Sequence, residues 1–311
     1  MMRSLYSSVA GLKSHQTAMD VVGNNIANVN TFGYKTQRTT FRDAYYQTLQ
    51  GSADSTKDLG GVNSLQIGYG SGVATVDTNH ELGGYAATGY TMDCYIDGEG
   101  YFVATDTSGN AYLTRVGAFY FDADGYLVDG NGRYICGYSP KLNADGSVQV
   151  DPDTQEPIMD TDAFTAATTP VPGTQDTSFE NVRICKPLDD EGEPIALSSI
   201  AIGVTGVVTG VNREGEVVTI GQIVLANVPN PDGLTLLGDS YWKAMKNVGE
   251  YTFETPGHLT GELVSGGLEA SNVDLANEIT QMITVQRGYQ ANSRVINVAD
   301  SMLEELVNLK R

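Results

Sequence analysis

Apolar residues recur every three or four positions in a polar segment at the start of the chain. Between residues 4 and 28 they fall on one face of a helix, and Gln16 and Gly23 fill the skipped positions of the repeat. This spacing is typical of a coiled-coil seam, so the sequence predicts a helix that packs its apolar stripe on another helix. The stripe consists of Leu5, Val9, Leu12, Met19 and Ile26.

The end of the chain repeats this pattern from about residue 271 onward. Its apolar stripe consists of Leu275, Ile279, Met282, Tyr289, Ile296, Leu303 and Leu306. At 1.5 Å per residue the two predicted helices are roughly 37 Å and 57 Å long, which is more than a small β domain can cover. We therefore expect each helix to bury its stripe against the other and against other copies of the protein. Ser4 is the expected N-cap of the first helix, and Ser271 with Asp274 resembles a capping box for the last.

The chain between these helices is typical of β structure. Runs rich in β-branched and aromatic residues alternate with Ser-Gly, Asp-Gly and Asn-Gly turn pairs, which predicts a meander of hairpins. The expected strands are 101–105, 112–116, 118–122, 126–128 and 133–138, and strand character returns over 201–228 with Gly215 in a turn. Residues 36–65 suggest an extended or partly helical connector.

These elements predict an α+β fold in which the terminal helices pair as a coiled-coil-like domain around a mostly antiparallel β domain. We assign residues 1–35 and 270–311 to the helical domain, and residues 36–139 and 196–269 to the β-rich middle with its connectors. Residues 140–195 hold many of the prolines and acidic residues, so we expect a small variable outer insertion there.

The segment 23–35, Gly-Asn-Asn-Ile-Ala-Asn-Val-Asn-Thr-Phe-Gly-Tyr-Lys, is unusual for the end of a helix. Its asparagine amides can bond backbone or partner groups, and a glycine at position 33 permits a positive φ that redirects the chain. A plain helix C-cap is the alternative interpretation. The residues of interest are Asn24, Asn25, Asn28, Thr31, Gly33, Tyr34 and Lys35.

The charge is distributed unevenly along the 311 residues. The formal net charge is −20, and residues 51–269 alone carry −22, so the two ends together are slightly basic. This distribution suits ends that pack together and a middle that faces water. Nucleic acid is not an expected partner, because phosphate binding needs clustered Lys and Arg.

Membrane and targeting signals are not evident in the sequence. No apolar run approaches the 18 or so residues of a membrane span, and the N-terminal segment has no continuous apolar core like that of a cleavable signal peptide. These features predict a protein that stays in the cytoplasm or is exported by another route. The cysteines Cys94, Cys136 and Cys185 are odd in number and widely spaced, so we expect small buried hydrophobic residues rather than disulfides or a metal site.

Candidate catalytic chemistry is weak, and we predict no catalytic, metal-binding or cofactor-binding residues. His15, His80 and His258 lie far apart in the sequence. The Asp122-Ala-Asp124 and Asp151-Pro-Asp153 segments lack the rest of a calcium loop, and turn formation explains both. A soluble enzyme or binding module is the remote alternative to a structural role, because a spatial triad leaves no mark in one sequence.

Four sequence segments resemble the bacterial flagellar rod and hook family. They are Met-Arg-Ser-Leu-Tyr-Ser-Ser-Val-Ala-Gly-Leu at 2–12, the 23–35 segment, Gln-Arg-Gly-Tyr-Gln-Ala-Asn-Ser-Arg at 286–294 and, more loosely, the β region with Asp97-Gly-Glu-Gly-Tyr-Phe-Val and Leu113-Thr-Arg-Val-Gly-Ala-Phe. Within the family, residues 288–293 and 306–311 look more like the hook members than the distal-rod members. The resemblance therefore favours a hook subunit that polymerises into a curved tube and transmits torque; a subunit of the straight distal rod is the alternative.

The resemblance also implies where the parts lie and which partners they meet. The terminal helices would form an inner tube, the β domain the next shell, and the insertion the solvent-facing surface. Implied partners are other copies of the chain, the distal rod, hook cap and hook–filament junction proteins, and the flagellar type III export apparatus. The implied location is the extracellular hook–basal body structure, reached without cleavage of a signal peptide. Phe41 and Tyr45 are placed like the short export signal of such proteins.

Overall fold

The computed structural model describes residues 2–52, 54, 60–107, 109–141, 149, 158–160, 183–187 and 195–309. The chain forms two compact units. The helical unit comprises Met1–Val29, Lys35–Asn79 and Val273–Arg311, and the β unit comprises Asn30–Tyr34 and His80–Asn272. Each unit is described separately below.

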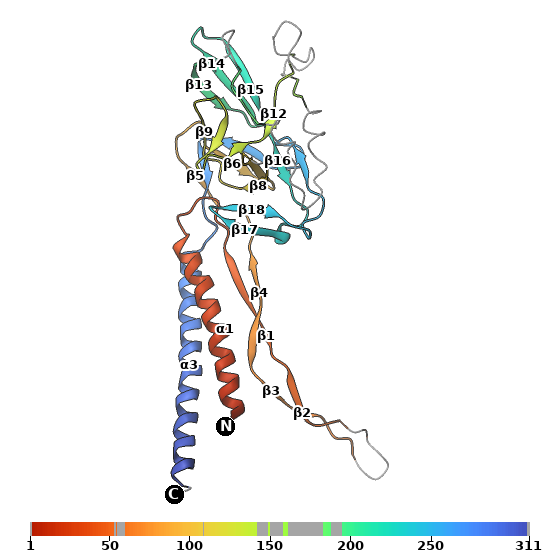
Figure 1. Cartoon of the computed structure of the whole chain (residues 1–311), viewed down its shortest axis with the longest axis vertical. Helices are drawn as coiled ribbons and strands as arrows, with labels where there is room; N and C mark the ends of the chain where they lie inside the picture. The colour runs from red at the N-terminus through yellow and green to blue at the C-terminus, as the bar shows by residue number, and fades with distance from the viewer. Residues whose placement is uncertain are drawn as a thin grey trace. The chain divides into compact units, whose positions relative to one another are not determined.

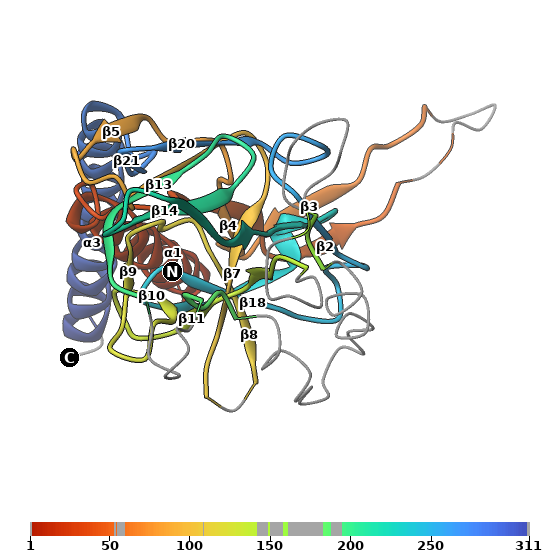
Figure 2. The same cartoon turned by 90° about the horizontal axis from the view of Figure 1, so that it is seen from above.

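Two long helices run side by side in the helical unit (Figures 1 and 2). They are α1, Met2–Ala27, and α3, Leu275–Asn308. They are antiparallel, because Gly11 lies against Asn292 whereas Gly23, farther along α1, lies against Met282, which comes earlier in α3. The Asp274 carboxylate caps α3 by accepting hydrogen bonds from the backbone N–H groups of Ala276 (3.0 Å) and Asn277 (3.3 Å). This cap satisfies two of the amide donors that a helix start leaves without partners.

A two-stranded ribbon contacts α1 in the same unit (Figure 1). Its strands are β1, Gln37–Asp43, and β4, Ser71–Thr78, which pair antiparallel with a bulge between Thr40 and Phe41. The shorter pair β2, Tyr46–Gln50, and β3, Leu65–Gly68, continues the hairpin.

The β unit is built around one nine-stranded sheet with antiparallel pairing. Its main path runs β17 (Leu234–Gly238), β18 (Tyr241–Ala244), β8 (Ala111–Thr114), β7 (Tyr101–Thr105), β11 (Tyr134–Ile135), β10 (Leu127–Asp129) and β9 (Phe119–Phe121). Strand β16 (Leu225–Asn227) pairs with β7 and with β19 (Thr252–Glu254), and a short 3₁₀ turn, Pro231–Gly233, precedes β17.

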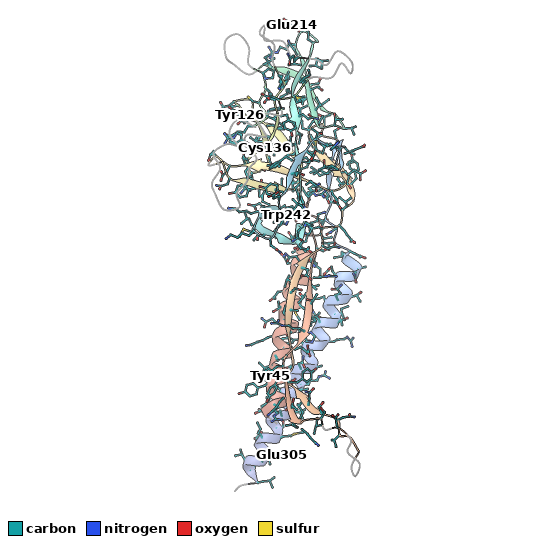
Figure 3. All side chains as sticks on the ribbon, turned by 90° about the vertical axis from the view of Figure 1, so that its right-hand side faces the viewer. Tyr45, Tyr126, Cys136, Glu214, Trp242 and Glu305 are labelled. Atoms are coloured by element: carbon teal, nitrogen blue, oxygen red, sulfur yellow. The ribbon has the colours of Figure 1, made fainter. Side chains whose placement is uncertain are left out.

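Smaller sheets complete the β unit. A four-stranded sheet has the order β12 (Gly137–Tyr138), β15 (Val217–Ile223), β14 (Val207–Asn212) and β13 (Leu197–Ile202). Strand β20 (Glu262–Ser265) pairs with β6 (Cys94–Asp97), and β21 (Gly267–Glu269) pairs with β5 (Tyr85–Ala87). Glu214 marks the β14–β15 turn in Figure 3, where Gly215 has φ +86° as the turn prediction requires.

Strand β7 is buried on both faces and separates two apolar clusters. Phe102 and Ala104 join a cluster that includes Ile96, Leu127 and Leu225. Tyr101 and Val103 point the other way, into a second cluster that includes Leu113, Cys136 and Trp242. Because side chains alternate along a strand, one strand can serve both cores. Figure 3 labels Cys136 and Trp242 among the β-unit side chains.

The structure confirms the predicted α+β class, with terminal helices and mostly antiparallel β structure between them. Strand 101–105 coincides with β7, and the other predicted hairpin strands overlap β8 to β12. The expected caps are wrong: Ser4 lies inside α1, which already begins at Met2, and Asp274 rather than Ser271 caps α3. Asp274 lies directly before the first turn of α3, so its carboxylate reaches the free N–H groups there. Ser271 lies three residues farther upstream.

Two further expectations meet the structure differently. Of the two forms expected for the connector over 36–65, its described residues adopt the extended one, with β1 and β2. Residues 35–79 group with the helices, because β1 and β4 contact α1. Most of the expected insertion, 140–195, lies outside the described residues.

Candidate assembly surfaces

The face of α1 that is buried within the subunit consists of small and polar residues. Its members recur every three or four positions: Ser8, Gly11, Ser14, Ala18, Val22 and Asn25. Small side chains allow neighbouring backbones to approach closely, so this face is suited to contacts inside the subunit. It lies on a different side of the helix from the predicted apolar stripe.

The contact between α1 and α3 depends on glycines from both helices. A Cβ atom at Gly11 would lie 2.6 Å from the Asn292 side chain, and one at Gly288 would lie 2.7 Å from the His15 ring. Gly23 is different, since a Cβ there would meet the end of the Met282 side chain at an ordinary 3.9 Å. The helices therefore approach most closely where Gly11 and Gly288 lie.

The other side of the buried α1 face contacts the ribbon. The Ser14 hydroxyl donates to the carbonyl oxygens of Ala10 (3.0 Å) and Ser71 (3.1 Å), which ties the first residue of β4 to the helix. Next to it, Gly70 has φ +110°, and a Cβ there would lie 3.1 Å from the Ser7 backbone. A side chain at position 70 would separate the ribbon from α1, so glycine is required here for both reasons.

The predicted α1 stripe is only partly covered inside the subunit. Leu5, Leu12, Met19 and Ile26 are half-buried, and Val9 is exposed. The subunit thus buries the small face of α1 and leaves part of the large apolar face accessible.

Helix α3 divides its predicted stripe in the same manner. Met282, Ile296 and Leu303 are half-buried and share a face with the buried Ala299, whereas Leu275, Ile279, Tyr289 and Leu306 are exposed. Ile283, Val295, Val298 and Met302 are also exposed, although the sequence did not single them out. Leu275, Ile279 and Ile283 follow one another at four-residue spacing and form one continuous ridge, which we call the Ile279 ridge.

The asparagine segment connects α1 to the ribbon. Asn25 is fully buried, and its side-chain amide donates to the Gln37 carbonyl (2.7 Å) while its Oδ1 accepts from the Gln37 N–H (3.0 Å). The Asn28 amide donates to the Asn24 carbonyl (2.9 Å) and Oδ1 (3.1 Å). This segment therefore does more than end a helix, because Asn25 holds the first residue of β1 in the way that a neighbouring strand would.

The rest of the segment turns the chain. Gly33 has φ +66°, as predicted, and the Thr31 carbonyl accepts a hydrogen bond from the Tyr34 N–H (3.4 Å). Tyr34 and Lys35 are both buried.

The ribbon carries a second set of exposed apolar side chains. Tyr45, labelled in Figure 3, is 71% exposed and stacks on Tyr69 with ring centroids 4.9 Å apart. Phe41 is also exposed, and its ring centroid lies 5.8 Å from that of His15. Further exposed apolar residues on β2, β3 and the adjoining chain are Tyr46, Leu49, Val62, Leu65 and Ile67. A two-stranded ribbon exposed on both faces is marginally stable alone, so these residues favour contact with another molecule.

The described part of the chain shows no group of three or more His, Cys, Asp or Glu side chains arranged to hold a metal ion. Asp122 acts in a turn, where its side chain accepts from the Tyr126 N–H (2.7 Å) and its carbonyl from the Gly125 N–H (3.2 Å). The Asp151-Pro-Asp153 segment lies outside the described residues. None of the described helices is both long and apolar enough to cross a membrane.

The cysteines follow their prediction in part. Cys94 and Cys136 are completely buried, and burial raises the pKa of each thiol to about 12. Cys185 is only half-buried, although burial raises its pKa as well. All three are free thiols. The two inner cysteines therefore act as small apolar residues of the β unit.

Family profiles match three regions of the chain. Residues 5–35 match the flagella basal body rod protein profile, residues 95–167 match the D1 domain of the flagellar hook proteins FlgE/F/G, and residues 264–309 match the C-terminal region of the flagellar basal body rod proteins FlgEFG. The first and third regions contain most of α1 and α3, and the second covers part of the β unit.

Known proteins match over the full length. The chain is 40% identical to the flagellar basal-body rod protein FlgG of Bacillus subtilis across 314 positions, with 100% of both chains covered. It is 31% identical to FlgG of Agrobacterium fabrum, covering 97% of each chain, and 29% identical to the flagellar hook protein FlgE of Borreliella burgdorferi, covering 100% of each. The FlgE alignment extends over 442 positions, 131 more than the 311 residues of this chain.

Proposed function

Because the chain belongs to the flagellar rod and hook protein family, we propose that it is a structural subunit of the distal rod, the straight shaft of the flagellar basal body. The observation that carries this proposal is the 40% identity to a rod protein in an alignment of 314 positions that covers 100% of both chains. Hook relatives align at 27–29% identity and over 442 or 464 positions, so each contains long segments that this chain lacks. The hook function expected from residues 288–293 and 306–311 is not confirmed. Across the whole chain, the identity to the rod protein is higher and its alignment is shorter than for the hook proteins.

We infer that the subunit polymerises mainly through its helices. The small face of α1 is used inside the subunit, which leaves Val9 and the Ile279 ridge to pack on neighbouring copies. The exposed ribbon residues would add a second contact. An interface between different surfaces of identical subunits forms a ring if the rotation between neighbours closes the circle, and an open helical assembly if it does not. We propose the second outcome, a helical tube.

The proposal extends to partners and location as follows. The chain would meet other flagellar rod and hook components, would lie in the flagellar basal body, and would reach it through the flagellar export apparatus without cleavage of a signal peptide. Phe41 and Tyr45 remain the predicted export signal, and the domain division into inner helices, β shell and outer insertion remains part of the proposal. We assign the chain no catalytic role.

Assembly of the purified full-length protein tests this function. Sedimentation and negative-stain electron microscopy would follow the protein as salt and concentration are raised. Straight, rigid tubes are the expected result, and curved tubes would return the assignment to the hook. A monodisperse particle under every condition would contradict both and would make the apolar stripes ordinary core positions.

A genetic test separates rod from hook independently. The gene would be expressed in two Bacillus subtilis strains, one lacking its own FlgG and one lacking its hook protein. Motility restored only in the strain without FlgG supports the proposal, whereas motility restored only in the strain without the hook protein contradicts it.

A further inference from the structure

One glutamate of the β unit lies where the chain repeatedly enters and leaves that unit. The chain passes between the two units after Val29, after Tyr34, after Asn79 and after Asn272. Glu269, at the end of β21, is almost completely buried with 1% of its side chain exposed. Its position matters because it bonds residues from each of the other connecting segments.

The bonds of Glu269 are made by its backbone and its carboxylate. The Gly33 N–H donates to the Glu269 carbonyl oxygen (2.8 Å), and the Gly83 N–H donates to Glu269 Oε1 (2.8 Å). Gly33 belongs to the segment Asn30–Tyr34, and Gly83 lies just after the chain re-enters at His80. At the four points where the chain crosses between the units, the residues on the β-unit side are Asn30, Tyr34, His80 and Asn272. Each of them lies within three positions of Glu269 or of Gly33 or Gly83, the residues bonded to Glu269.

Arg115 holds the other side of the carboxylate. Its Nη1 lies 3.6 Å from Glu269 Oε2, and only 4% of its side chain is exposed. The same Nη1 donates to the Gly98 carbonyl (3.0 Å), and the guanidinium lies over the Tyr101 ring at 5.1 Å. The Tyr101 hydroxyl shares a 2.9 Å hydrogen bond with Nδ1 of His80, the residue at which the chain re-enters the β unit.

The connecting segments are packed too tightly to move separately. A Cβ at Gly33, which has φ +66°, would lie 2.8 Å from Val116 Cγ2 and 3.3 Å from the Arg115 carbonyl carbon. A Cβ at Gly83 would lie 1.9 Å from the Ala270 carbonyl oxygen. These glycines bring the segments 30–34 and 80–84 directly against the strands that carry the ion pair.

We propose that Glu269, held by Arg115, is the anchor that fastens every connecting segment to the β unit, so that the chain's entries and exits keep one fixed arrangement. A role in core stability alone does not explain the pair, because burying two charges is costly and an apolar pair of similar volume is often at least as stable. The pair also explains three sequence motifs together, since Gly33, Gly98 and Arg115 come from the segments 23–35, 97–103 and 113–119.

Hydrogen exchange of the full-length chain, read by mass spectrometry below the concentration of assembly, tests the anchor. Glu269→Gln removes the ion pair with Arg115 but keeps an acceptor for Gly83 and the backbone carbonyl that bonds Gly33. If the ion pair fixes the position of Glu269, peptides over 30–34 and 80–84 should exchange at least tenfold faster, while peptides over β7 and β16 keep the wild-type rate. Glu262→Gln on β20 is the matched control, because that glutamate is exposed and the charge change is the same. It should leave both connecting segments unchanged.

A double variant is needed if Glu269→Gln leaves the buried Arg115 charge without its ion-pair partner and the protein unfolds. Arg115→Met with Glu269→Met removes both charges and the side-chain acceptor for Gly83 but keeps the backbone carbonyl that bonds Gly33, so the β unit should fold while 80–84 exchanges fast. Wild-type exchange at 80–84 in the folded double variant would overturn the anchor, as would equal acceleration of β7. These readings do not depend on tube formation, so the rod proposal and the anchor fail separately.

Discussion

Replacing Ile279 by aspartate should abolish assembly and leave the subunit folded. Ile279 lies in the centre of the Ile279 ridge on α3 and is 46% exposed in the single chain. A carboxylate there can remain hydrated in the free subunit, but it loses its water if the ridge becomes an interface. Leu303 is a poorer position for this substitution, because it is half-buried on the face of α3 that holds Ala299.

The expected magnitude follows from the exposed fraction. Fully burying an isoleucine side chain is worth about 1.5–3 kcal/mol, so covering the exposed half of Ile279 adds about 1 kcal/mol to each subunit contact. Ile279→Ala should therefore raise the critical concentration for assembly by about fivefold. Burying an unpaired carboxylate costs several kcal/mol more, so Ile279→Asp should raise it by about a thousandfold or prevent assembly altogether.

Sedimentation of a concentration series measures this threshold, and circular dichroism checks that each variant is folded. Val217→Asp is the control, because Val217 on β15 is an apolar residue with 71% exposure in the β unit. It adds the same charge and should change the threshold by less than about twofold if the helices dominate assembly. A folded Ile279→Asp chain that assembles at the wild-type threshold would refute the role of the Ile279 ridge.

Three further substitutions or conditions test the fold itself. Gly288→Ala should lower the free energy of unfolding of the helical unit by about 1–3 kcal/mol in urea, because the new methyl group overlaps the His15 ring. Asn25→Ala should cost about 1–3 kcal/mol in the same assay, because the N–H and carbonyl of the half-buried Gln37 in β1 lose the buried Asn25 amide as their partner. For the β unit, the free energy of unfolding should fall as the pH rises from about 9 to about 12, followed by Trp242 fluorescence. Burial raises the thiol pKa values of Cys94 and Cys136 from 9.0 to about 12, so the unfolded chain loses these protons first and alkali favours unfolding.

Each of these tests has an internal comparison. Gly23→Ala adds a methyl group on the same helix pair without a clash, and it should be neutral or slightly stabilising because alanine favours helix. Gln16→Ala, on the exposed side of α1, controls for the loss of a side-chain amide. A free energy of unfolding of the β unit that stays constant through pH 12 would contradict the raised pKa of the buried thiols.

The sequence predicted local elements well wherever one short stretch determines them. Strand β7 was identified by its run of aromatic and β-branched residues, and the positive φ values of Gly33 and Gly215 by the turns that need them. The sequence does not identify the ribbon, because β1 pairs with residues 28 to 41 positions away, from Asp43 with Ser71 to Gln37 with Thr78, and no tight-turn signal marks the connection. Pairing at such a distance depends on the whole fold.

The candidate surfaces were predicted only in part, and for a physical reason. Large apolar residues at helical spacing identify Val9 and Ile279, which the subunit leaves exposed. They do not mark the buried face of α1, where close packing selects small residues such as Gly11 and Ala18. Small residues at the same spacing are the sequence signal of that face. The anchor at Glu269 could not have been found at all, since its bonds join segments separated by as many as 236 positions.

The helix pair also governs the order in which this molecule can fold. Between Ala27 and Leu275 lie 247 residues, so synthesis completes α1 long before its partner exists. During that interval α1 can contact the ribbon but not α3, and most of the stability of a helix in a protein comes from tertiary packing. The helix pair of the helical unit therefore forms only after α3 has been synthesised, and until then the chain lacks the paired helices with which to assemble. The long sequence separation between α1 and α3 thus delays competence for polymer growth until α3 has been synthesised.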